Sequence, residues 1–139
     1  MHEGSSIISL DAQLPEVERL NQIARRFGEL HEVPSRALYS LNLALDELVT
    51  NVILYGYDDP AGQKITVQIQ AVPQMLTGSV EDSGREFDPL AMPAPDLNAP
   101  LASRELGGLG IHLVRNLMDE VTYQREGGKN LLTIRKRIR

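Results

Sequence analysis

The sequence contains no cysteine and no tryptophan, and aromatic residues make up only 4% of its 139 residues. Without cysteine the chain forms no disulfide and offers no thiolate to a metal, which fits a reducing compartment. His2, His31 and His112 are scattered without the spacing of zinc ligands. The scarcity of aromatic side chains leaves few platforms on which the bases of single-stranded nucleic acid could stack. These absences argue against a secreted disulfide-bonded domain, a zinc site and a single-strand-binding protein.

Excess positive charge and long apolar runs are also missing. The formal net charge is −5, whereas general affinity for nucleic acid needs clustered Lys and Arg. The basic run at residues 135–139 is expected to be the solvated end of a strand. No apolar run is expected to reach the roughly 20 residues that span a bilayer, and the N-terminus lacks the basic and apolar segments of a signal peptide. We therefore expect a cytoplasmic protein that contacts neither nucleic acid nor a membrane directly.

Hydrophobic periodicity predicts two helices in the first half of the chain, which is expected to form one domain over residues 1–139. A short strand is predicted at residues 7–10, followed by a helix that begins at Pro15. A second helix is predicted from Ser35, as its N-cap, to near Gly56. The apolar stripe expected to pack on the core in the first helix consists of Val17, Leu20, Ile23, Ala24, Phe27 and Leu30.

The second half of the chain has the pattern of strands. Alternation of apolar and polar residues predicts neighbouring strands at 65–69 and 76–82, and a hairpin of strands at 121–123 and 131–138. Apolar residues at helical spacing predict a helix over 111–118. The expected class is therefore α+β: a two-layer sandwich with a mixed, mostly antiparallel sheet covered by helices on one face.

A long segment between these elements has a composition unlike the rest. Residues 89–100 contain four prolines, which exclude a helix or a central strand there. Loops of this length in a small domain are commonly lids or binding loops. We expect residues 89–106 to form a mobile lid.

Glu47 and Asn51 are spaced so that both lie on one side of the second helix, about one turn apart. An Asn oxygen is a hard ligand suited to Mg²⁺, which takes further ligands from water and substrate phosphates. Glu47 could activate a nucleophile beside that metal. The alternative is that both are ordinary solvated helix residues, since Glu is a good helix former and is usually exposed.

Asp82 follows an apolar strand and precedes Ser83 and Gly84. Its carboxylate only accepts hydrogen bonds and could accept one from the amino group of adenine, while Gly84 would let the backbone approach the base. The alternative is a simple turn, because Asp, Ser and Gly are common turn residues.

Gly107, Gly108 and Gly110 stand directly before the predicted helix at 111–118. Free backbone N–H groups at a helix N-terminus bind phosphate. The run lacks the lysine of a Walker loop and the spacing of a Rossmann fingerprint, and the chain has no His-Arg-Asp of a protein-kinase catalytic loop. Both common nucleotide-binding folds are therefore disfavoured.

Taken together and in this order, the three motifs resemble those of the GHKL (Bergerat-fold, histidine kinase-like) ATPase superfamily. Residues 47–51 look like its N box, residues 82–89 match the Asp-x-Gly-x-x-Phe-Asp-Pro form of its first glycine box, and residues 107–111 look like the second. Small size and the Phe-Asp-Pro sequence make the chain most similar to bacterial anti-sigma-factor serine/threonine kinases.

The resemblance implies roles for individual residues. The position of Glu47 holds the general base, that of Asn51 the Mg²⁺ ligand and that of Asp82 the acid that recognises adenine, while Thr133 matches a threonine that helps to bind the base. Between Pro89 and Gly107 the only basic residue that could reach the γ-phosphate is Arg104. The resemblance assigns ATP binding to Asn51, Asp82, Gly84, Arg104, Gly107, Gly108, Leu109, Gly110, Ile111 and Thr133.

The resemblance also implies a reaction and partners. The γ-phosphoryl group of ATP, bound with Mg²⁺, would pass to a serine or threonine of an anti-anti-sigma (STAS-type) protein and so control a sigma factor, with the kinase acting as a homodimer. An alternative is an ATP-dependent module that sequesters a regulator such as a sigma factor without phosphorylating it. Glu47 favours the kinase, whereas the sparsely charged lid favours the module. The catalytic half of a histidine kinase ranks third, because no upstream helical pair bears a phosphoacceptor His.

Overall fold

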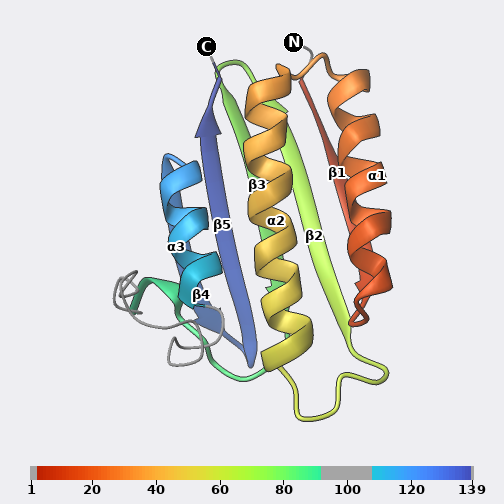
Figure 1. Ribbon diagram of the computed structural model, residues 1–139, viewed down its shortest axis with the longest axis vertical. Coiled ribbons are helices and arrows are strands. Elements are labelled where there is room, and N and C mark those ends of the chain that lie inside the picture. The colour runs from red at the N-terminus through yellow and green to blue at the C-terminus, as the bar shows by residue number, and fades with distance from the viewer. Residues whose placement is uncertain (1–2, 92–107, 139) are drawn as a thin grey trace.

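Five strands form a single antiparallel sheet in the computed structural model, which describes residues 3–91 and 108–138 (Figure 1). Their order across the sheet is β1-β2-β3-β5-β4. Each strand is antiparallel to its neighbours. The strands are β1 (Gly4–Asp11), β2 (Lys64–Val72), β3 (Met75–Asp82), β4 (Glu120–Glu126) and β5 (Lys129–Arg137).

The expected mixture of parallel and antiparallel pairs is not found among these strands. A pair of helices connects β1 to β2, so the chain reverses direction and the two strands run antiparallel. One helix connects β3 to β4, but the antiparallel strand β5 lies between them. The other connections are hairpins, which always give antiparallel pairs.

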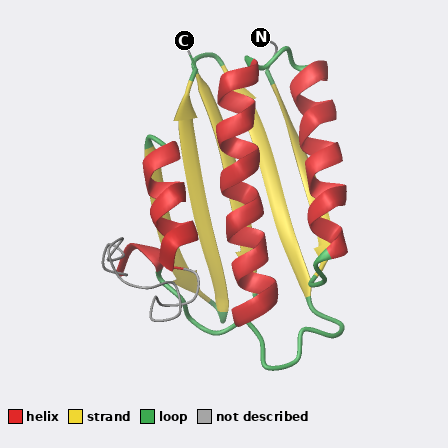
Figure 2. Cartoon of the chain, in the orientation of Figure 1, coloured by secondary structure: helices red, strands yellow, loops and turns green. Residues whose placement is uncertain are grey.

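Three helices cover one face of the sheet, as the two-layer prediction requires (Figure 2). They are α1 (Pro15–Leu30), α2 (Ser35–Tyr55) and α3 (Gly108–Leu117). Alternate residues of each inner strand face these helices: Ile65, Val67 and Ile69 of β2 are fully buried, whereas Gln68 between them lies on the open face. A short 3₁₀ turn, η1 (Pro89–Ala91), follows β3.

Two details of the predicted helices are wrong. Leu30, expected in the core, is 69% exposed, because the chain leaves α1 at His31 and Val33 fills the core instead. Ser35 is not the N-cap of α2. Pro34 occupies that position in an extended conformation, so Ser35 is already the first helical residue and no side chain caps this end.

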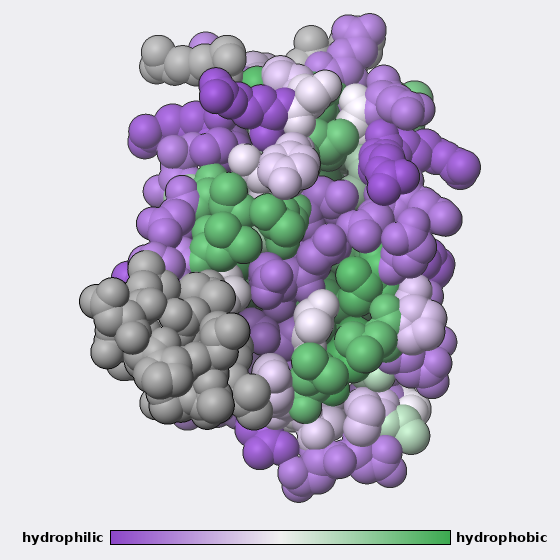
Figure 3. Space-filling view, in the orientation of Figure 1, coloured by the Kyte–Doolittle hydropathy of each residue, from purple (hydrophilic) through white to green (hydrophobic). Residues whose placement is uncertain are grey.

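The helix α2 has the predicted length but is more apolar than the sequence analysis expected of any segment. It has 21 residues, and its most apolar window has a mean hydropathy of 1.2, enough to cross a membrane by length and composition. One helix of this kind is weak evidence for a span, because a core helix passes the same test. Leu41, Leu45 and Val49 are fully buried in the core, and Asp46 and Glu47 lie midway along the helix. Figure 3 shows that, on the helix-covered face, hydrophobic residues form separate patches among hydrophilic ones.

Candidate functional site

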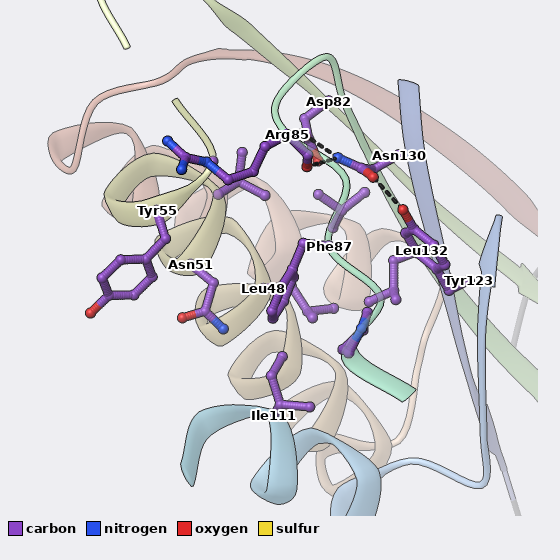
Figure 4. Close-up of a pocket in the computed structure, with 14 residues that line it drawn as sticks. Leu48, Asn51, Tyr55, Asp82, Arg85, Phe87, Ile111, Tyr123, Asn130 and Leu132 are labelled. Atoms are coloured by element: carbon purple, nitrogen blue, oxygen red, sulfur yellow. Dashed lines mark hydrogen bonds between the residues drawn. The ribbon is translucent and has the colours of Figure 1, made fainter. Parts of the chain in front are cut away.

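A cavity of about 320 Å³ opens where the C-terminal half of α2, the end of β3 and the start of α3 meet. Its walls are mostly apolar, and a few polar groups converge on it, the composition typical of a ligand site. Figure 4 shows Asn51 and Asp82 reaching it from different sides. The lining residues are Leu48, Asn51, Val52, Tyr55, Gly56, Val80, Asp82, Arg85, Phe87, Pro89, Ile111, Tyr123, Asn130 and Leu132.

Asp82, the last residue of β3, is the acidic residue of this cavity and is only 7% exposed. Its Oδ1 accepts hydrogen bonds from the backbone N–H of Gly84 at 2.8 Å and from Nδ2 of Asn130 at 3.0 Å. No donor of the described chain is bonded to its Oδ2. A carboxylate held in this way is a fixed hydrogen-bond acceptor for a ligand.

Gly84 does not line the cavity. The lack of a side chain at this position lets its backbone lie close to the backbone of another segment of the protein. A Cβ at this position would lie 2.6 Å from the carbonyl oxygen of Gly56, at the end of α2. Arg85 donates its backbone N–H to the same oxygen at 2.9 Å. Ser83 donates its own N–H to the hydroxyl of Tyr57 at 3.0 Å. The turn after Asp82 is thereby anchored to the C-terminal end of α2.

On α2, Asn51 faces the cavity with an amide that is not hydrogen-bonded to any described residue. Its Nδ2 atom is buried and makes no hydrogen bond within the described residues. An unpaired buried amide costs free energy, so such a group in a cavity wall calls for an explanation such as a ligand. The amide oxygen accepts no hydrogen bond from the part of the chain that the structure describes, so it is available for the metal-binding role that the motif implies.

Glu47 lies one turn earlier, against Gly110, and does not line the cavity. A Cβ on Gly110 would lie 2.3 Å from Oε2 of Glu47, so a larger residue at this position would displace the carboxylate. Ile111, the next residue, is buried and lines the cavity. The structure therefore brings the predicted base, the predicted metal ligand and the start of α3 together.

Several predicted site residues fall outside what the structure describes. Gly107 and Arg104 lie there, as does most of the predicted lid at 89–106. Gly108 and Leu109 are described as the first residues of α3, without their surroundings.

Thr133, predicted to help bind the base, does not line the cavity. It pairs with Ser79 and Thr122 on its neighbouring strands, and strand alternation puts it on the open face, opposite to Leu132. Successive residues of a strand point to opposite faces, so the side chain of Thr133 lies on the face of the sheet away from the cavity.

Asn130 occupies the place next to Asp82, and sequence reasoning missed it. It stands opposite Asp82 in the β3–β5 register and is 6% exposed. Its Nδ2 donates to Oδ1 of Asp82 and, at 2.9 Å, to the carbonyl of Arg85, while its Oδ1 accepts from the hydroxyl of Tyr123. Burial raises the pKa of Tyr123, so this hydroxyl stays a donor. Only the β3–β5 register, which pairs Asn130 with Asp82, could have identified Asn130 as a site residue.

Arg85 is the one basic residue among those that line the cavity in the described part of the chain. Its guanidinium pairs with Oδ1 of Asp58 at 2.7 Å and is about half exposed. Arg125 binds nearby, donating to the carbonyl of Gly84 at 2.8 Å. Positive charge is therefore present beside Asp82. The sequence analysis had considered basic residues only in the predicted lid.

Asp46, beside Glu47 on α2, has an unusual protonation equilibrium. Its pKa is raised to about 6, chiefly by burial; a hydrogen bond from Asn21 opposes the rise, and the charges of Glu47 and Glu18 add to it. Asp46 does not line the cavity. It makes the middle of α2 sensitive to pH near neutrality.

The chain is similar in sequence to bacterial proteins named as serine or serine/threonine kinases. The serine/threonine-protein kinase BtrW of Bordetella bronchiseptica is 27% identical over 100 residues, which cover 72% of this chain and 70% of that protein. The serine-protein kinase RsbW of Listeria monocytogenes is 29% identical over 119 residues, covering 82% of this chain and 73% of that protein.

Solved structures support the fold. The structure of the RsbU and RsbW domains of Rv1364c from Mycobacterium tuberculosis matches with a TM-score of 0.69 at 17% identity, over 97% of this chain but only 32% of that chain. A histidine kinase domain from Erythrobacter litoralis EL346 matches with a TM-score of 0.53 at 20% identity, over 88% of this chain and 60% of that chain. Residues 10–136, which run from β1 to β5, match the family model described as a histidine kinase-like ATPase domain. The chain belongs to the histidine kinase-like ATPase domain family.

Proposed function

We propose that this protein is a regulatory serine/threonine kinase of the anti-sigma-factor type, which binds ATP with Mg²⁺ in the cavity between α2, β3 and α3. The observation that supports this most directly is that one cavity contains both an acceptor for the base and a polar group for the metal and phosphates. Asp82 offers a fixed carboxylate acceptor, and Asn51 offers an unpaired buried amide beside the start of α3. The similarity to proteins named as serine kinases supports the same activity.

In this proposal the adenine base lies at the Asp82 end of the cavity. The carboxylate accepts a hydrogen bond from the exocyclic amino group, and apolar side chains such as Leu48, Ile111 and Leu132 contact the faces of the ring. The phosphates extend toward Asn51 and α3. The backbone N–H groups of the first turn of α3 have no partners within the helix and favour negative charge.

Asn51 would hold Mg²⁺ through its amide oxygen, with Gly107, Gly108 and Gly110 near the phosphates and Arg104 brought in by a lid at 89–106. When bound, the metal neutralises charge on the phosphates. Phosphoryl transfer then depends mainly on positioning and on charge neutralisation.

Glu47 acts as the general base in the proposed reaction. Its carboxylate takes the proton of a serine or threonine hydroxyl on the partner, and that hydroxyl oxygen forms a bond to the γ-phosphorus. The bond from the γ-phosphorus to the β–γ bridging oxygen breaks, and ADP leaves with its electron pair. Geometry supports this role, because Glu47 lies against Gly110 at the start of α3.

The partner in this proposal is a STAS-type anti-anti-sigma protein, and the regulated protein is a sigma factor. The protein acts as a cytoplasmic homodimer formed by single domains of residues 1–139, without direct contact to nucleic acid or a membrane. A net charge of −5 is consistent with the absence of nucleic-acid binding.

A second function is favoured by one observation. Arg85 is the basic residue among the described residues that line the cavity, and it is already paired with Asp58. Among those described residues, no unpaired cation is present to neutralise a transferring phosphoryl group. A domain of this kind could bind ATP and sequester a regulator without phosphorylating it.

The experiment that separates these functions begins with titration of the purified protein with ATP and Mg²⁺. Labelled ATP is then incubated with the protein and with STAS-type proteins of the same organism. Binding followed by labelling of a partner serine or threonine supports the kinase. Binding without labelling supports the sequestering module, and absence of binding refutes both.

A further inference from the structure

We infer that Asn130 and Tyr123 are positioning residues that hold Asp82 as an acceptor, and that they thereby select a purine with an amino group at C6. The inference rests on the proposed nucleotide site and adds a specificity mechanism to it. Neither residue belongs to the motifs recognised in the sequence.

The amide of Asn130 is fully oriented by its surroundings. Its two N–H hydrogens go to Oδ1 of Asp82 at 3.0 Å and to the carbonyl of Arg85 at 2.9 Å, and its oxygen accepts from the hydroxyl of Tyr123. Turning the amide over would place its oxygen against a carboxylate and a carbonyl, and all three of these groups are acceptors. One orientation is therefore strongly preferred.

This orientation determines what Asp82 can do. Two donors, the Gly84 N–H and the Asn130 amide, occupy Oδ1 of Asp82. The other oxygen is not bonded by any described donor. The hydrogen bonds thus run in one direction, from the Tyr123 hydroxyl to Asn130 and from Asn130 to Asp82, and end in an acceptor.

An acceptor at this point discriminates between purines by the group at C6. Adenine carries an amino group there, which donates to the carboxylate. Hypoxanthine and guanine carry a carbonyl oxygen, which would face the carboxylate as a second acceptor. A buried site built for one hydrogen-bond pattern rejects the opposite pattern, because the unpaired groups remain desolvated.

The test compares ATP with inosine triphosphate, which differs at C6 by a carbonyl in place of the amino group. Both nucleotides are titrated with Mg²⁺ into the wild type and into Asn130→Leu, Asn130→Asp and Tyr123→Phe. The wild type should prefer ATP by about tenfold or more, the range expected for a hydrogen bond to a charged group. Asn130→Leu should reduce this preference to within about threefold, and Tyr123→Phe should reduce it less, because Asn130 keeps its bonds to Asp82.

The Asn130→Asp variant adds a pH signature that a purely structural role would not produce. Two carboxyl groups at this separation share a proton, so the pKa of the pair is raised. At low pH the introduced carboxyl can still donate to Asp82, and the preference for ATP should persist. It should decline as pH rises and the shared proton is lost.

Gln68→Glu is the matched control, because it makes the same amide-to-acid change on the open face of β2. Its preference for ATP should equal that of the wild type, and thermal unfolding establishes that each variant is folded. A folded Asn130→Leu or Asn130→Asp variant that keeps the wild-type preference at every pH overturns the inference. So does a wild type that binds ATP and inosine triphosphate equally, whereas a wild type that binds neither refutes the proposed function itself.

Discussion

The two polar regions of the cavity differ in how completely their groups are paired. Around Asp82, the carboxylate and the Asn130 amide are held by a network that includes Gly84, Arg85 and Tyr123. Around Asn51, the amide nitrogen is buried and unpaired, and Glu47 packs against Gly110. The region around Asp82 is already ordered by its own hydrogen bonds, so it can discriminate between ligands. The region around Asn51 contains a buried amide nitrogen that a ligand could bind.

The largest effect is expected at Glu47. Glu47→Gln keeps the shape of the side chain but removes the base, so phosphoryl transfer should fall by roughly 10²- to 10⁴-fold. ATP affinity should change by less than about threefold, because no cavity wall is altered. Rates of partner labelling and ATP titration measure the two quantities, with Glu29→Gln on the exposed side of α1 as control. An equal loss of binding and transfer would contradict the role as base.

The next effect tests the preorganised region. Asp82→Asn replaces the acceptor with an amide and also disturbs the donors bonded to it, so ATP affinity should fall by roughly 10- to 100-fold. Calorimetric titration measures the change, and Asp59→Asn on the α2–β2 loop is the control for lost charge. Unchanged affinity would remove Asp82 from the site.

Gly84→Ala should loosen the same region through its backbone. The new Cβ would lie 2.6 Å from the Gly56 carbonyl, and relieving that overlap should reduce the free energy of unfolding by about 1–3 kcal/mol. Gly62→Ala is an informative comparison, because its Cβ would meet nothing within 4 Å and only its positive φ is unfavourable, at about 1 kcal/mol. Denaturant unfolding of both variants gives the two values, and an equal loss would refute the steric explanation.

The smallest effect concerns Asp46, on the helix that carries Glu47. Its pKa of about 6 lies above the unfolded value of 3.8, so its protonation contributes stability that is full below about pH 4 and lost as pH rises through 6. Asp46→Asn imitates the protonated form and should stabilise the protein at pH 7.5 by about 1 kcal/mol, after allowance for partial exposure. Thermal unfolding at both pH values should show no difference near pH 4. A stability gain of the same size at pH 7.5 and near pH 4 would show that the gain does not come from the ionisation of Asp46.

Local patterns were sufficient to predict most of the fold. Alternation along β2 and β3 and the apolar stripe of α1 are set by neighbours in sequence, so periods of two and 3.6 residues identify them. Asp82 could be predicted at the end of β3 for the same reason. The predictions for Leu30 and Ser35 were wrong because the ends of a helix depend on where the chain turns next. The pattern inside the helix does not determine this.

Site residues that belong to a single sequence motif could be predicted. The site residue that is brought in by strand pairing was missed. Glu47 and Asn51 share a helix, so their spacing alone places them together. Asn130 reaches Asp82 only through the β3–β5 register, and a shift of one residue exchanges the two faces of a strand. Thr133 was selected by resemblance without this register, and it therefore fell on the opposite face.

The contact between Asp82 and Asn130 joins residues 48 positions apart in the chain. Because β5 follows the other four strands along the chain, this contact can form only after they have been synthesised. A newly synthesised chain can build β1, α1, α2, β2 and β3 while Asp82 still lacks its hydrogen bond from Asn130, which forms when β5 docks beside β3. If ATP binds as proposed, acquisition of affinity would mark the completion of folding, and nucleotide present during synthesis would favour chains that have reached it.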